Sequence, residues 1–383
     1  LYTSQGVFRV VFGFATVCWL FSALLNFNIA RIIKPLGATI LFFAIIICYY
    51  LIGYGDMRWY EIVKYLLLVA FAFNSLAYNE LGDDKLNRYI VTLTIILLTI
   101  TCITTVYGLI ESPTASRLLT ASSTNEAVAD SLQAKNIGSY DFIYGLVLLL
   151  PCVVFHFPSE KKKLLRVMEL VLIPLSVAAI ILSNFTTAQV LLLADVAIIF
   201  TFSKKRRLDK VLLVGAILIL LLPTALRIYV TLLAANSNSI LAYNKLNGIL
   251  NYLSGTSNMN TVTSRYGLLL KSINAFFSHP IFGVGAYYST ATQMIGYHST
   301  IPDEFARFGI IGGGAVIGFT FWALSKVAIN HETHEKYYRF VPIIILYFIL
   351  GFLNPIFNYA ILAVIFIIAP SLIRTATSSR GLI

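Results

Sequence analysis

Apolar runs of about twenty residues follow one another along most of this 383-residue chain, and they limit what it can fold into. Only 12% of the residues are charged, whereas a soluble domain carries about 25%. In a bilayer, only helices and closed barrels satisfy their own backbone, and barrel strands alternate apolar with polar residues. Because the runs here are unbroken, the sequence predicts an all-α, polytopic transmembrane helical bundle.

The runs predict eleven spans in a single membrane domain over residues 1–383. The spans are expected near 7–27, 36–54, 60–80, 89–110, 138–157, 167–184, 186–202, 211–232, 305–329, 341–353 and 356–373. The segment Asn354-Pro355 interrupts the last long run, so 341–373 is read as two helices or one kinked pair. The chain begins with Leu, and one further helix missing at the N-terminus would bring the total to twelve and start the chain in the cytoplasm.

The basic residues set the expected orientation. Loops 159–166 and 203–210 are rich in Lys and Arg, so both are expected in the cytoplasm. Alternation then places a smaller loop, 112–137, and a large loop, 233–304, outside. Long loops usually carry function, and the large loop is the expected active site. The net charge of +11 flanks apolar runs, which is a topology signal and not the pattern of a nucleic-acid-binding surface.

Residues 263–278 of the large loop have the pattern of an amphipathic helix. One face would carry Tyr266, Leu269, Leu270, Ile273, Phe276 and Phe277. Such a helix lies in the membrane interface and contacts lipid. Arg265 falls in its first turn, where its guanidinium would reach a lipid diphosphate, or would simply snorkel to a headgroup.

The segment 297–314 predicts the start of a span. Thr300 followed by Asp303 forms a capping box, so the helix is expected to begin near Ile301. His298 and Ser299 precede this N-terminus, where free N–H groups favour anions. A neutral His298 would accept a proton from a hydroxyl, and the alternative is a histidine that only closes a loop.

Two further residues of this segment, Arg307 and Tyr297, could each have either a structural or a substrate-binding role. Arg307 stands four residues after Asp303, which favours a local ion pair, although its charge also suits an anionic substrate. Tyr297 is one of several loop tyrosines that would stack on sugar rings or form the usual interfacial belt.

Several functional classes lack their sequence signatures. The chain contains no GxxxxGK[ST] phosphate loop, and HETHE at 331–335 departs from the HExxH zinc motif. The four cysteines, Cys18, Cys48, Cys102 and Cys152, sit in apolar runs without metal-ligand spacing and are read as packing residues. No metal and no cofactor are expected.

The stretch 265–314 resembles the O-antigen polymerase and ligase family of bacterial envelope glycosyltransferases. The family motif is a His, then Asn, Ser or Gln, nine residues, and GxxG. Here His298 and Ser299 are followed by nine residues and by Gly309-Ile-Ile-Gly312. Upstream, the family shows an Arg and a HPxxGxG turn, matched by Arg265 and by HPIFGVG at 279–285. The motif region covers under a sixth of the chain.

The segment 116–146 is similar to the polymerase branch, which makes Arg117 and Lys135 a candidate second cationic patch. The family often has Ser-Arg in an outer hairpin turn, but the turn at 183–189 has no Arg. Arg227, at the outer end of the eighth predicted span, is the candidate replacement.

The resemblance implies a glycosyltransferase with a polyprenyl-diphosphate-linked glycan donor and a sugar acceptor, placed in the bacterial inner membrane with its active site on the periplasmic side. His298 would be the base, and Arg265 would hold the diphosphate with Arg117 or Arg227; Lys135, Ser299, Tyr297 and Arg307 would bind the diphosphate or the glycan. A chain-length regulator protein is a further expected partner. Two alternatives stay open: a ligase that moves finished glycan onto lipid A core or protein, and a lipid-linked glycan flippase or transporter, whose clearest interior charge would be Asp195.

Overall fold

A computed structural model describes residues 29–52, 59–81, 84–119, 126–202, 260–285, 294–329 and 338–378. The regular elements in these residues are helices, which confirms the predicted all-α class. In chain order they are α2 (Ile29–Ile52), α3 (Trp59–Leu81), α4 (Asp84–Glu111), α5 (Ala115–Leu118), α6 (Glu126–Ala134), α7 (Tyr140–His156), η1 (Phe157–Ser159), α8 (Lys163–Leu182), α9 (Thr186–Phe202), α12 (Asn260–Ser278), α14 (Thr300–Val327), α15 (Val341–Leu353), α16 (Tyr359–Ala363), the π-helical η3 (Val364–Ile368) and α17 (Ala369–Ser378).

Five helical segments of the described residues are long and apolar enough to cross a membrane, which indicates a multi-pass membrane protein. They are Lys85–Glu111, Tyr140–Ser159, Lys163–Leu182, Thr300–Val327 and Tyr359–Ala376. Four shorter apolar helices are Thr39–Leu51, Ile62–Leu76, Thr186–Phe202 and Val341–Leu353. Each of these nine segments coincides with a predicted span. The predicted spans 7–27 and 211–232 lie outside the described residues, so the total of eleven to twelve stays a prediction.

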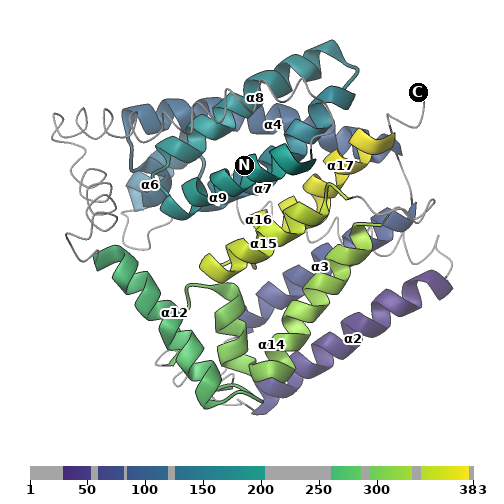
Figure 1. The fold of residues 1–383 in the computed structure, drawn as a ribbon, viewed down its shortest axis with the longest axis vertical. Helices are drawn as coiled ribbons and strands as arrows, with labels where there is room; N and C mark the ends of the chain where they lie inside the picture. The colour runs from purple at the N-terminus through teal and green to yellow at the C-terminus, as the bar shows by residue number, and fades with distance from the viewer. Residues whose placement is uncertain are drawn as a thin grey trace.

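Helix α7 lies at the centre of the bundle. Almost every residue from Ile143 to His156 is buried, and α8, α9, α15, α16 and α17 pack around it (Figure 1). A helix that is apolar on all sides needs partners on all sides, so the innermost position suits it. The outer helices α4 and α8 instead leave many large apolar side chains exposed, as lipid-facing helices do.

Contacts between distant segments define two ends of the bundle. At one end, Ser159 donates to the carbonyl of Ala376 (3.0 Å), and the Arg339 guanidinium lies over the Phe155 ring. At the other, Asn358 donates to Asp141 (3.1 Å). This grouping agrees with the alternation expected from the sequence. The exposed basic residues 161–163 lie at the first end, and the candidate site lies at the second.

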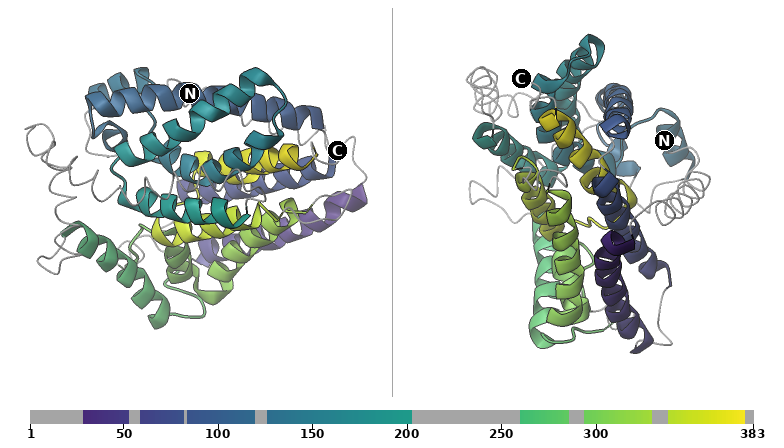
Figure 2. Two further views of the ribbon diagram at one scale, coloured as in Figure 1. Left: turned by 45° about the horizontal axis from the view of Figure 1, so that its top comes forward. Right: turned by 90° about the vertical axis from the view of Figure 1, so that its right-hand side faces the viewer.

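Helix α12 crosses the direction of the neighbouring spans at the second end (Figures 1 and 2). It covers Asn260–Ser278, so the predicted helix at 263–278 is confirmed and extended by one turn at its start. Helices α15 and α16 are separate, with Leu353 and Tyr359 as their limits, which settles the two readings of 341–373 in favour of two helices.

Helix α14 differs from the predicted span in two ways. Its N-cap residue is Ser299 and not Thr300, whose hydroxyl accepts instead from the Ile356 amide (2.8 Å). It is also broken at Gly309, where φ is 62° and ψ is −162°. Figure 1 shows the first turns of α14 running beside α12 before the chain bends into the long remainder.

Candidate functional site

The turn at 279–285 and the break in α14 fit together through their backbones. Four hydrogen bonds join them: Val284 N–H to Ala306 O (2.9 Å), Gly285 N–H to Arg307 O (2.8 Å), Ile310 N–H to Pro280 O (2.8 Å) and Ile311 N–H to Ile281 O (3.3 Å). The groups freed by the helix break are thus taken up by the turn. This pairing joins the two motifs, HPIFGVG and GIIG, that the family resemblance rests on.

Two glycines make this close approach possible. Gly283 and Gly309 both have positive φ, at 71° and 62°. A Cβ on Gly309 would lie 2.3 Å from the Ile281 carbonyl oxygen, and one on Gly283 would lie 2.3 Å from that of Arg307. Only glycine combines that backbone conformation with that spacing.

Helices α12 and α14 meet through small and polar side chains. Ser272 and Ala275 of α12 are buried, and the Ser272 hydroxyl donates to Asp303 Oδ1 (2.5 Å). The predicted apolar face is divided: Phe276 packs edge-on against Phe305 of α14, whereas Tyr266 is 58% and Phe277 is 72% exposed. A helix held on one side by the bundle, with large apolar side chains exposed beside that contact, has the form of an interfacial helix.

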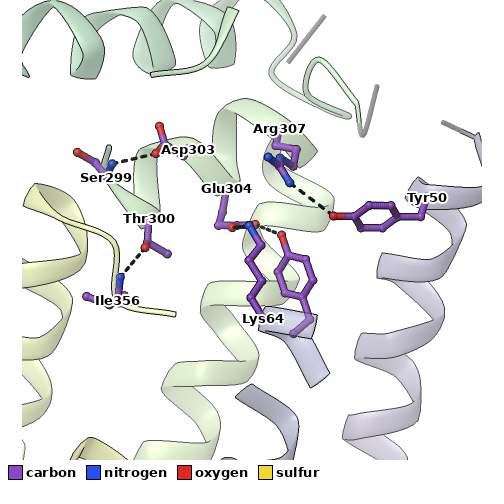
Figure 3. Close-up of polar contacts among 9 residues, drawn as sticks. Tyr50, Lys64, Ser299, Thr300, Asp303, Glu304, Arg307 and Ile356 are labelled. Atoms are coloured by element: carbon purple, nitrogen blue, oxygen red, sulfur yellow. Dashed lines mark hydrogen bonds and ion pairs between the residues drawn. The ribbon is translucent and has the colours of Figure 1, made fainter. Parts of the chain in front are cut away.

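Asp303 also holds the start of α14. Its Oδ2 accepts from the Ser299 backbone amide (2.8 Å), as Figure 3 shows. The predicted pairing of Arg307 with Asp303 is replaced by other contacts. Arg307 is buried, its guanidinium carbon lies 5.2 Å from the centre of the Tyr297 ring, and its Nη1 lies 3.5 Å from the Tyr50 hydroxyl.

A charged cluster that the sequence analysis missed lies beside Arg307. Buried Glu304 of α14 accepts from Lys64 Nζ (2.8 Å) and from the Tyr65 hydroxyl (2.6 Å), both on α3 (Figure 3). A charge buried in an apolar environment needs a partner, and Glu304 has two. The sequence did contain a signal for this cluster, because Lys64 and Glu304 carry opposite charges within two apolar runs, at 60–80 and 301–329.

The candidate base, His298, lies in the loop just before α14, between Tyr297 and Ser299. Tyr297 before it has a left-handed backbone conformation (φ 53°), and Ser299 after it is the buried N-cap residue of α14. The His298 side chain is partly buried, and its Nε2 atom is inaccessible to solvent. The structure thus brings together four residues proposed from the sequence: Tyr297, His298, Ser299 and Arg307.

Arg265 belongs to α12, three residues before Leu268. A Cβ on Gly296 would lie 2.2 Å from the Leu268 carbonyl oxygen, so the two backbones touch. Helical periodicity places position 265 on the same side of α12 as Ser272, two turns away. The α12 backbone at this position is therefore about one turn from the loop that carries His298. Arg227 lies outside the described residues.

Arg117 and Lys135 have other contacts at the same end of the bundle. The Arg117 guanidinium lies 5.8 Å from the centre of the Phe185 ring, in the hairpin turn where the family often has an Arg. Lys135 forms an exposed ion pair with Glu111 (3.4 Å). Exposed pairs of this kind hold a side chain weakly, so Lys135 is available to another anion.

Comparison with known proteins does not assign the chain to a family. No model of a known protein family matches it, and no curated protein is significantly similar to it in sequence. The fold and its apolar helices therefore define a class, a multi-pass helical membrane protein with a helix lying across one end of the bundle.

Proposed function

We propose that this protein is a glycosyltransferase that polymerises polyprenyl-diphosphate-linked repeat units on the outer face of the bacterial cytoplasmic membrane. The observation that carries the proposal is the interlocking of the HPIFGVG turn with the GIIG break of α14. Segments that match separate parts of the family motif contact each other, with His298 on the connected loop.

The proposed reaction is one displacement at the anomeric carbon of the donor. His298 accepts the proton of the acceptor hydroxyl while the new glycosidic bond forms and the bond to the diphosphate breaks. The anomeric configuration inverts, and the lipid diphosphate leaves with the electron pair of the broken bond. A guanidinium binds a diphosphate through two hydrogen bonds, so Arg265 is given the role of stabilising the developing charge.

The position of α12 supports the separate roles given to Arg265, which binds the diphosphate, and His298, which acts as the base. An interfacial helix lies at the depth of lipid headgroups, where the diphosphate of a polyprenyl carrier also lies. Position 265 is on the side of α12 that meets the His298 loop. One helix would therefore present the donor phosphates, and the loop beside it would present the base.

A ligase is the nearest alternative, because the two activities share the motif and differ only in the acceptor. Transport is the second alternative, and one observation bears on it. Asp195 of α9 is fully buried, and neither carboxyl oxygen has a hydrogen-bond partner among the described residues. Interior carboxyl groups of this kind are typical of transporters and pumps.

The test is a reconstitution with purified protein and a lipid-linked oligosaccharide in detergent. A polymerase gives lipid-linked products of two or more repeats, whereas a ligase leaves the donor unchanged until lipid A core or protein is added. A transporter gives no new covalent product in a system with one compartment.

The matched variants are His298→Ala and Asn274→Ala, the latter on the exposed side of α12. We expect His298→Ala to reduce the rate by about 10²–10⁴-fold, the usual range for a general base, and Asn274→Ala to keep it. Normal polymer lengths from folded His298→Ala protein would refute the assigned base.

A further inference from the structure

The backbone on both sides of His298 is held by side chains that neither motif includes. The Gly296 amide donates to the Ser272 hydroxyl (2.9 Å), and the Ser299 amide donates to Asp303 Oδ2 (2.8 Å). The two acceptors are joined, because Ser272 donates to Asp303 Oδ1 (2.5 Å). A continuous chain of hydrogen bonds therefore runs from one flank of His298 to the other.

The network is fully specified. Ser272 uses its one proton toward Asp303 and one lone pair toward Gly296, and each oxygen of Asp303 accepts one bond. Ser272 is fully buried on α12, and Asp303 is in the first turn of α14. Hydrogen bonds in a satisfied, partly buried network of this kind strengthen one another and favour one geometry.

The loop 296–299 contains a strained backbone conformation, which the hydrogen-bond network can stabilise. Tyr297 adopts a left-handed conformation (φ 53°) that is strained for a residue other than glycine. Local strain of this kind persists only where the surroundings hold it in place. Hydrogen bonds to a charged carboxylate are stronger than those between neutral groups, so the bonds to Asp303 can offset this strain.

We propose that Ser272 and Asp303 are positioning residues for His298. They fix the loop 296–299 between α12 and α14 and so set the direction of the imidazole. This inference rests on the proposed function, since it gives His298 the role of base. Asp303 is not itself assigned to the chemistry, because its two oxygens bond Ser272 and Ser299.

Ser272→Ala is the first test, and Ser278→Ala is its matched control. Ser278 is on the same helix and is exposed, and among the described residues its hydroxyl bonds only to the carbonyl of Asn274, one turn earlier. A misplacement of about 1 Å in a reacting group lowers rates by up to about 10²-fold. We expect Ser272→Ala to lower kcat by about 10–10²-fold with KM unchanged, and Ser278→Ala to change neither.

Asp303 offers a conservative variant. An Asn at 303 still accepts from the Ser299 amide and can donate to the Ser272 oxygen, whereas an Ala can do neither. Asp303→Asn is therefore expected to retain more kcat than Asp303→Ala at equal amounts of folded protein. Equal kcat for the two would contradict positioning through this network.

A second measurement does not depend on turnover. In a chain freed of its native cysteines, His298→Cys reports loop mobility through its rate of reaction with a maleimide. We expect Ser272→Ala to raise that rate at least tenfold over Ser278→Ala in proteins with the same unfolding temperature. Equal labelling rates would overturn the positioning role, whatever the activity of the protein.

The outcomes separate the inference from the proposed function. If His298→Ala keeps full activity, the base is wrong and the proposed mechanism fails. If His298→Ala is impaired but Ser272→Ala matches Ser278→Ala in both assays, the mechanism stands and the positioning role fails.

Discussion

The guanidinium carbon of Arg307 lies 5.2 Å from the centre of the Tyr297 ring. Arg307 belongs to α14, and Tyr297, which has a positive φ, lies in the loop just before that helix. Arg307 is buried and also lies near the Tyr50 hydroxyl on α2. This contact ties the loop before α14 to the first span that the structure describes. It makes the aromatic face of Tyr297 a structural requirement at that position.

Tyr297→Leu should therefore destabilise the protein more than Tyr297→Phe does. Leu removes the ring face on which the guanidinium lies, at a cost of about 0.5–2 kcal/mol for a cation–π contact between a buried guanidinium and a partly exposed ring. Phe keeps that face. The measurement is the unfolding temperature of the purified variants in detergent, and equal temperatures for Leu and Phe would count against the contact.

Gly309→Ala is expected to prevent the turn at 279–285 from docking. The added Cβ meets the Ile281 carbonyl at 2.3 Å, and positive φ alone costs roughly 1–3 kcal/mol. Gly314→Ala is the control, because a Cβ there has nothing within 4 Å and should stabilise the helix by up to about 1 kcal/mol. Size-exclusion profiles and unfolding temperatures measure both. A Gly309→Ala protein as stable as Gly314→Ala would show that the break is not required.

The pair Lys64–Glu304 should show strong coupling between its partners. Glu304→Gln leaves Lys64 without its carboxylate. Because the Lys64 side chain is 28% exposed, the expected cost lies below the roughly 3–5 kcal/mol of a fully buried ion pair broken from one side. Adding Lys64→Met should recover part of that loss, with a coupling energy of roughly 1–3 kcal/mol. Losses that simply add in the double variant would mean that the two residues act independently.

Cysteine accessibility tests the placement of α12 and the orientation of the chain. In a chain without native cysteines, Asn274→Cys should react with a maleimide that cannot cross the membrane, whereas Phe277→Cys should be protected by lipid until detergent is added. Lys162→Cys, in the basic loop, should react only after the cells are permeabilised. Labelling of Phe277→Cys at the rate of Asn274→Cys would exclude an interfacial helix, and labelling of Lys162→Cys in intact cells would reverse the orientation.

The spans could be predicted from the sequence because burial in lipid demands long uniform apolar runs. Every predicted span within the described residues has its helix, and the limits of α9 and α15 agree to the residue. The start of α14 was misplaced by one residue. Thr300 has the right side chain for a cap, but the adjoining 354–358 turn takes its hydroxyl, and Ser299 becomes the N-cap residue.

The contacts of the candidate site were harder to predict, because they depend on how elements far apart in sequence approach one another. Local spacing favoured an Arg307–Asp303 pair, yet α12 supplies Ser272 for Asp303 and α2 supplies Tyr50 for Arg307. The helix break at Gly309 was equally hard to predict from the sequence. A glycine in a long apolar helix usually indicates close packing, and only the facing turn at 279–285 shows why the helix stops there.

The same break determines how the site can open. Lifting α12 and its turn away from α14 would expose eight backbone donors and acceptors from four hydrogen bonds at the edge of an apolar medium. Each such group costs free energy unless water replaces its lost partner. We therefore expect the turn at 279–285 and the bent start of α14 to move together.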